Sequence, residues 1–158
     1  MKASLPLVVG VLALLLALFT LFSDGKTDGV AKAEIIEELA PAMGDMQRFA
    51  EKLYFAGQAG NWPLADFYLH EIEETVEKVI KSNIVDEGVP VSSFMKTMFP
   101  PSVEGIKGPV KARDAAQFAA RYEGLISSCN ACHQATQHGF VKITVPRQPT
   151  YENQDFRP

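Results

Sequence analysis

Residues 61–81 read NWPLADFYLHEIEETVEKVIK, and this stretch decides the fold class. Its apolar residues recur at steps of three and four, which places them on one face of an α-helix. This stripe consists of Ala65, Leu69, Ile72, Val76 and Val79. Asn61 is a suitable N-cap, and Pro63 is tolerated in a first helical turn. The stretch therefore predicts a helix with one buried face and one solvated, mostly acidic face.

The preceding segment shows the same periodicity and ends at Gly57-Gln58-Ala59-Gly60. Its stripe comprises Ile36, Leu39, Met43, Met46, Ala50, Leu53 and Gly57. Pro41 interrupts the stripe, so we expect the helix either to kink there or to begin there with Pro41 in its first turn.

Two further helical segments follow a loop expected at residues 83–91. Residues 92–112 contain three prolines and two glycines, which predicts a broken or kinked helix. The next helix starts at Asp114, whose spacing to Gln117 is typical of a capping box, and we expect Gly139 to end it. Its predicted core face consists of Ala116, Ala120, Leu125 and Ile126.

Helices of this length with short connections favour an all-α fold, an antiparallel four-helix bundle over residues 34–139. Residues 140–158 form the C-terminal tail. We expect a short extended stretch over Phe140–Val145 and a loosely ordered end from Arg147, which is polar and contains proline.

The N-terminus carries an apolar run from Leu5 to Phe22 that is uncharged and follows Lys2. The run is long for a secretory signal and about adequate to span a membrane. We expect residues 1–25 to be an uncleaved anchor, with a cleaved signal as the alternative, and residues 26–33 to be a linker. We do not expect this run to be a buried core helix, because it is apolar on all sides and lies at the extreme N-terminus. Either favoured interpretation exports the remaining chain to the periplasm.

The composition narrows the function classes. The chain has 158 residues, 47% of them hydrophobic, and a net charge of −4, which suits one ordinary domain and argues against a nucleic-acid binder. Two cysteines are too few for a disulfide-dense scaffold. No nucleophile–base pair, phosphate loop or paired carboxylate site stands out, so we do not expect an enzyme.

The chemistry-bearing motif is Cys129-Asn130-Ala131-Cys132-His133. A C-x-x-C-H run is the attachment signature of c-type haem. Thiols one helical turn apart can form thioethers to the two vinyl groups of a porphyrin, and His133 can then bind the iron. Three alternatives compete, namely a thioredoxin-like redox pair, a zinc site completed by His138, and a bare disulfide that gives His133 no role.

The chain resembles the class II c-type cytochromes, which include the cytochrome c-prime proteins and their Met-ligated low-spin relatives. The resemblance covers residues 34–138 and rests on the helices and on C-x-x-C-H near the end of the last one. Four stretches also resemble a group of small exported monohaem proteins: KLYFAG at 52–57, GNWPLAD at 60–66, CNACHQAT at 129–136 and NQ at 153–154. Some relatives carry His at the position of Ala50, which this chain lacks.

A sixth iron ligand is expected from the first helix, which lies beside the end of the last one in such a bundle. Met43 is the preferred distal ligand and Met46 the alternative, although methionine at helical spacing also serves as core filler. With Met bound, the haem suits single-electron transfer. Without it, five-coordinate iron would suit a sensor or scavenger of NO or CO. The resemblance also implies redox partner proteins and a homodimer.

The remaining candidates have simpler explanations. His138 is expected to be exposed, with contact to a haem edge as the alternative, and His70 is expected to be solvated on the acidic helix face, which could also dock a basic redox partner. Aromatic residues form two groups for which core packing competes with haem contact. One group is Tyr54, Phe55, Trp62 and Phe67, and the other, with an aliphatic member, is Phe118, Tyr122 and Ile126.

Overall fold

The computed structural model describes residues 38–158, all of which belong to one compact unit, Ala33–Pro158. The expectations for the anchor or signal, for the linker and for Ile36 lie outside the described residues. Among the helices within residues 38–158, none combines the length and the apolar character needed to cross a bilayer.

Five helices follow one another along the described chain. They are α2 (Leu39–Gln58), α3 (Trp62–Lys81), α4 (Val91–Met98), α5 (Pro100–Ala112) and α6 (Ala115–Ala135). Within residues 38–158 the β-type pairing is limited to an isolated bridge between Asp86 and Val89, in the loop after α3. The expected all-α class is confirmed for this part of the chain.

The first two helices begin where the sequence predicts. Because α2 starts at Leu39, Pro41 lies in its first turn, where it starts the helix instead of kinking it. Asn61 caps α3, since its side-chain oxygen accepts a hydrogen bond from the Leu64 backbone N–H at 3.3 Å. Gly60 takes a left-handed φ of +72°, which lets the chain reverse between the helices. All five residues of the predicted α3 stripe are buried.

The third segment is a broken helix, as predicted. Helix α4 ends at Met98 and α5 begins at Pro100, with Phe99 between them. Pro100 has no N–H to donate to the preceding turn, and its ring crowds the carbonyl there, so the helix cannot continue through it. Pro109 is nevertheless accommodated inside α5, where it is buried.

Helix α6 begins as predicted and ends earlier than predicted. The Gln117 backbone N–H donates to Asp114 Oδ1 at 3.0 Å, which confirms the cap. The Gln117 side chain donates to the other Asp114 oxygen at 2.8 Å instead of reaching back to the backbone. The expected end at Gly139 is wrong, because Gln137 already takes a left-handed φ of +65° and the helix stops at Ala135.

The core face of α6 also differs from the expectation. Leu125 and Ile126 are buried as predicted, whereas Ala116 and Ala120 are exposed. The buried positions in their place are Phe118 and Tyr122, two residues further on and therefore about 200° around the helix axis. The large aromatic side chains, rather than the alanines, determine which side of this helix faces inward.

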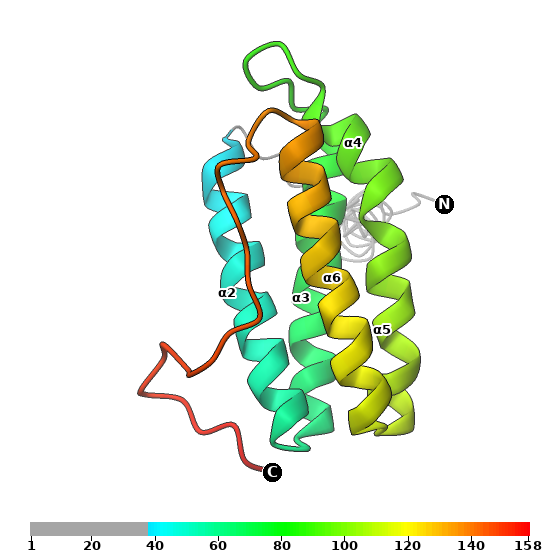
Figure 1. Cartoon of the computed structure of the whole chain (residues 1–158), viewed down its shortest axis with the longest axis vertical. Coiled ribbons are helices and arrows are strands. Elements are labelled where there is room, and N and C mark those ends of the chain that lie inside the picture. The colour runs from blue at the N-terminus through cyan, green and yellow to red at the C-terminus, as the bar shows by residue number, and fades with distance from the viewer. Residues whose placement is uncertain (1–37) are drawn as a thin grey trace, which may run out of the picture. The chain divides into compact units, whose positions relative to one another are not determined.

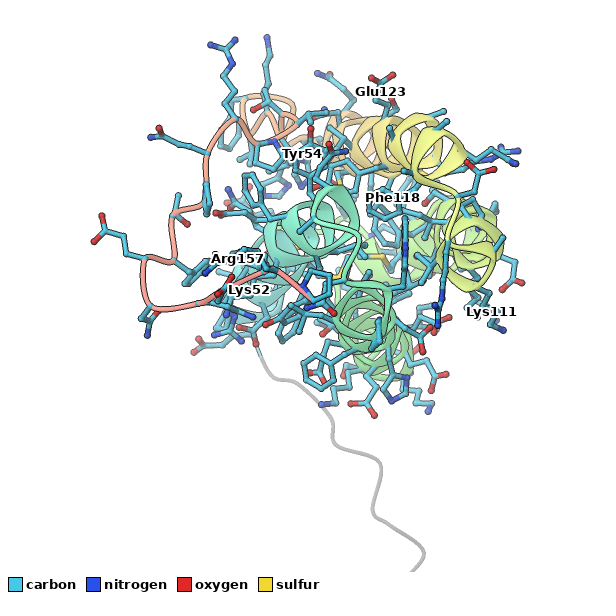
Figure 2. The ribbon with its side chains drawn as sticks, turned by 90° about the horizontal axis from the view of Figure 1, so that it is seen from below. Lys52, Tyr54, Lys111, Phe118, Glu123 and Arg157 are labelled. Atoms are coloured by element: carbon cyan, nitrogen blue, oxygen red, sulfur yellow. The ribbon has the colours of Figure 1, made fainter. Side chains whose placement is uncertain are left out.

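Helices α2, α3, α5 and α6 lie side by side, and successive ones run in opposite directions (Figure 1). Each contributes a fully buried side chain to one shared core, which includes Leu53, Leu69, Ile106 and Phe118. Seen along the helices, Phe118 points into this core while Lys111 and Glu123 project outward (Figure 2).

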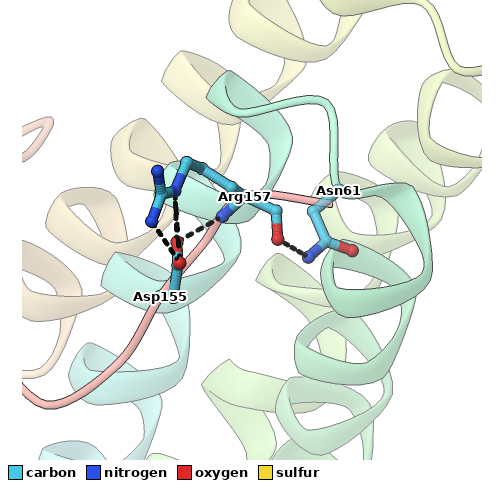
Figure 3. A network of polar contacts seen from close by, with 3 residues as sticks. All are labelled: Asn61, Asp155 and Arg157. Atoms are coloured by element: carbon cyan, nitrogen blue, oxygen red, sulfur yellow. Dashed lines mark hydrogen bonds and ion pairs between the residues drawn. The ribbon is translucent and has the colours of Figure 1, made fainter.

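The C-terminal tail is packed, which contradicts the expectation of a loosely ordered end. An extended stretch is present as predicted but begins at Val141 instead of Phe140, which lies in a turn, and it descends between α2 and α6 (Figure 1). Phe156 is buried against Phe55, with ring centroids 5.8 Å apart. The Arg157 carbonyl accepts a hydrogen bond from the Asn61 side chain at 3.0 Å, and the Arg157 side chain pairs with Asp155 (Figure 3).

Candidate functional site

The motif Cys129–His133 lies on the last two turns of α6. Cys129 is half-buried against the core and Cys132 is buried, and both are free thiols. Because they are three residues apart on a continuous helix, the two side chains leave the same face one turn apart. The helix thus presents two thiols and the adjacent imidazole together, as the haem interpretation requires.

Burial raises the pKa of the Cys129 thiol to about 12, and proximity to Cys132 adds to the shift. Burial also raises the pKa of Cys132. A catalytic C-x-x-C pair has the opposite property, a lowered thiol pKa that makes the thiolate available as a nucleophile. The environment of the two cysteines therefore argues against the thioredoxin-like alternative.

The His133 ring is held by the C-terminal tail. Its Nδ1 lies 2.8 Å from the carbonyl oxygen of Val141. Because a carbonyl oxygen only accepts hydrogen bonds, Nδ1 must carry a proton, so in the neutral imidazole Nε2 keeps its lone pair. Nε2 has no hydrogen-bond partner among residues 38–158. This tautomer is the one an iron-binding imidazole needs.

Sequence reasoning missed Asn130, the residue that fixes the tail beside His133. The Asn130 side chain donates to the Ile143 carbonyl at 2.8 Å and accepts from the Ile143 N–H at 2.8 Å. The motif signature leaves this position unspecified, so the motif itself does not point to the contact. A polar side chain beside a cysteine, followed by a short extended segment, is the weak pattern that could have suggested it.

The register between α2 and α6 locates the two candidate methionines. The Tyr122 hydroxyl donates to the Ala50 carbonyl at 2.9 Å, which places these two residues level with each other. Met43 lies seven residues before Ala50 and Cys129 seven after Tyr122, about 10 Å along antiparallel helices in each case. Met43 is thus level with Cys129 and half-buried, whereas Met46 is level with Ile126 and buried in the core.

The other histidines lie apart from the thiols. His70 is exposed as predicted, and its Nε2 lies 3.3 Å from Glu74. His138 is only partly exposed, contrary to the expectation. Its Nδ1 lies 2.8 Å from the Thr136 carbonyl and its Nε2 lies 3.5 Å from Asp86. Within residues 38–158 no three His, Cys, Asp or Glu side chains are grouped as they would be around a metal ion.

The aromatic candidates divide between core and surface. Phe118 and Tyr122 are fully buried and Ile126 is buried in the same core, so core packing accounts for this group. The other group is not one cluster, because Phe67 is 51% exposed and its ring contacts only Tyr68 among the described rings. A hollow of about 650 Å³ lies beside Tyr54 and Phe55, under residues 145–147 and toward the end of α2 opposite Met43.

Comparison of the chain with protein-family models, with characterised proteins and with solved structures finds no match. The resemblance to class II c-type cytochromes therefore rests on the sequence alone, through its predicted helices and the C-x-x-C-H motif near the end of the last one.

Proposed function

We propose that the chain is an exported monohaem c-type cytochrome that transfers single electrons and is built as the antiparallel four-helix bundle of class II. The observation that carries the proposal is the donor set at the end of α6. The half-buried Cys129 and the buried Cys132 leave one helix face a turn apart, and the neutral imidazole of His133 beside them presents an unprotonated Nε2. A bare disulfide between the two cysteines would give His133 no role.

Each residue of the site has a defined role in this proposal. Cys129 and Cys132 would hold the haem through thioethers, and His133 would bind the iron through Nε2. The bound haem would supply one-electron chemistry between ferric and ferrous iron. Cys132 is buried and Cys129 packs against the core, so the attachment points are largely shielded from solvent.

Met43 is the proposed distal ligand, and Met46 remains the alternative. The Tyr122–Ala50 contact supports Met43, because it brings that residue rather than Met46 level with the cysteines. Thioether ligation raises the reduction potential and leaves the iron shell little changed on electron transfer.

The expected surroundings follow from the same interpretation. We propose a periplasmic protein, tethered by residues 5–22 or released after their cleavage, that is not an enzyme. Its partners would be redox proteins and a second copy of the chain. Ion pairs partly neutralise the acidic face of α3, including one between Glu73 and Lys107, so a basic partner would meet less charge there than the sequence suggests.

The test is production of the full chain with a c-type cytochrome maturation system. We expect haem that survives denaturing electrophoresis and gives the ferrous spectrum of thioether-linked haem. Cys129→Ser combined with Cys132→Ser should abolish the covalent attachment. Ser127→Ala, on the same helix and exposed, is the matched control and should leave it intact. Covalent haem in the double serine variant would refute the proposal.

The distal ligand needs a separate measurement. The wild-type protein should be low-spin with a weak far-red band from Met–iron ligation, and Met43→Ala should lose that band while Met46→Ala keeps it. A high-spin wild-type spectrum with a ferrous form that binds CO would instead support the gas-binding alternative.

A further inference from the structure

We propose that the C-terminal tail, residues 140–158, is the element that positions His133, and that Asn130 is the positioning residue that fastens it. The inference rests on the proposed function for its consequence, since His133 is taken as the iron ligand. Its geometric basis is independent of haem, because it concerns hydrogen bonds between α6 and the tail.

The two contacts with the tail are matched in spacing. Asn130 and His133 are three residues apart and leave one side of α6. Their partners Ile143 and Val141 are two residues apart in extended backbone, where alternate carbonyls point the same way. The paired hydrogen bonds between Asn130 and Ile143 therefore set the register that brings the Val141 carbonyl to His133 Nδ1.

The remainder of the tail holds this register from the other side. Both the backbone N–H and the hydroxyl of Thr150 donate to Glu51 on α2, at 2.6 and 2.8 Å. The Gln154 side chain donates to the Tyr68 hydroxyl on α3. With Phe156 buried further along, the tail is tied to three helices, so residues 141–143 have little freedom to slide along α6.

This arrangement has two chemical effects on His133. A hydrogen bond from Nδ1–H to a carbonyl fixes the tautomer and the rotation of the ring. It also makes Nε2 a stronger electron donor, which favours ferric over ferrous iron and lowers the reduction potential. Without Asn130, the Val141 carbonyl would lose its register beside His133. In the haem-free chain, the Nε2–H tautomer of His133 would then gain population. In the haem-bound chain, Nε2 would become a weaker electron donor and the reduction potential would rise.

The first test uses the haem-free full chain with reduced thiols and ¹⁵N-labelled histidine. At a pH where the imidazole is neutral, the wild-type ring nitrogens of His133 should report a protonated Nδ1 and an unprotonated Nε2. Asn130→Ala should shift both resonances toward the other tautomer. Asn153→Ala, an exposed asparagine in the same tail, should leave them unchanged. Unchanged His133 shifts in Asn130→Ala would overturn the proposal.

The second test uses the haem-loaded chain and measures the midpoint potential. Asn130→Ala should raise the potential while keeping covalent haem, and Asn153→Ala should match the wild type. Asn130→Asp keeps an acceptor for the Ile143 N–H and loses the donor to the Ile143 carbonyl. Its midpoint potential should therefore lie between those of the wild type and Asn130→Ala. This variant keeps the proposal testable if Asn130→Ala fails to fold. If the wild type takes up no covalent haem, the proposed function fails, whereas the ¹⁵N experiment still decides the positioning role.

Discussion

Gly57 and Phe118 form a close contact between α2 and α6 that only glycine permits. A Cβ atom at Gly57 would overlap the Phe118 ring, which is fully buried and cannot move aside. We predict that Gly57→Ala destabilises the fold by about 1–3 kcal/mol, the usual cost of an overpacked core. Urea unfolding followed by circular dichroism measures this loss.

Gly44 provides the matched control in the same helix. A Cβ at that position meets no atom within 4 Å, so Gly44→Ala gains helix propensity without a clash. It should be neutral or stabilising by up to about 1 kcal/mol. Equal destabilisation by both alanines would mean that the Phe118 contact is not responsible.

Tyr122 makes a second residue-scale prediction. Burial raises the pKa of its phenol, so the hydroxyl stays protonated and donates to the Ala50 carbonyl. Tyr122→Phe keeps the ring and removes this hydrogen bond, which should cost about 1 kcal/mol. Tyr54→Phe is the control, because its hydroxyl has no hydrogen bond within residues 38–158. Matching unfolding curves for Tyr122→Phe and the wild type would contradict the prediction.

At the residue scale, the sequence identified the candidate site residues but not the contacts that hold them in place. Cys129, Cys132 and His133 could be found because their spacing along one helix is a local property. The roles of Asn130 and Val141 could not, because their contacts join positions whose separation depends on how the chain turns after α6. The same limit applies to Met43, whose level beside Cys129 follows from a hydrogen bond between distant helices.

Among the helices, α6 gives a pH-dependent prediction. Hydrogen bonds from the Gln117 backbone and side chain hold the pKa of Asp114 below its ordinary value of 3.8. A lowered folded pKa means that the stabilisation is present above the unfolded value and lost as the pH falls through the folded one. Asp114→Asn keeps a capping oxygen that does not titrate. It should therefore lose less thermal stability than the wild type between about pH 6 and about pH 2.

Asp114→Ala completes this comparison. It removes the cap at every pH, so its unfolding temperature should already be lower at neutral pH. If Asp114→Asn and the wild type lose stability in parallel on acidification, the cap does not contribute to the pH dependence.

The tail is the element with the clearest local test. Phe156→Ala removes its buried anchor, and we expect the tail amides to lose protection from hydrogen exchange while the helices keep theirs. Phe140→Ala changes the same residue type in the same tail at a side chain that is 80% exposed, and should leave the exchange pattern unchanged. Loss of protection throughout the helices would show that the tail is part of the global fold.

The buried face of a helix was predicted correctly where apolar residues repeat at helical spacing. Prediction failed where the size of a side chain or a contact with a distant part of the chain determines which residues are buried. All five predicted residues of the α3 stripe are buried because they leave one face of the helix, although Tyr68 and Thr75 are buried beside them and were not predicted. For α6 the alanines fitted the helical period as well as the aromatics did, and only packing against Gly57 and Ala50 selects Phe118 and Tyr122. The tail was misjudged because polar and proline-rich composition does not reveal specific partners such as Glu51 and Asn61.

For the whole molecule, the prediction concerns the membrane. Residues 5–22 would span about 27 Å as a helix, close to the thickness of a bilayer core. We expect the full chain to remain with the membrane fraction after an alkaline wash. A version with residues 1–25 replaced by a cleavable signal should be soluble in the periplasm. If the protein expressed from the full-length sequence is instead soluble and its first residue lies beyond Phe22, the N-terminal segment is a cleaved signal.

The contacts that the tail makes with α2, α3 and α6 have a consequence for how the protein matures. Residues 141–157 follow the C-x-x-C-H motif in the chain, so they emerge from the ribosome after it and, in the exported protein proposed above, would cross the membrane after it. Until they dock, His133 lacks its hydrogen bond to the Val141 carbonyl, and its ring would be free to turn. A haem-attaching machinery would meet its substrate in this interval. A variant whose tail docks faster would then shorten the time available for maturation.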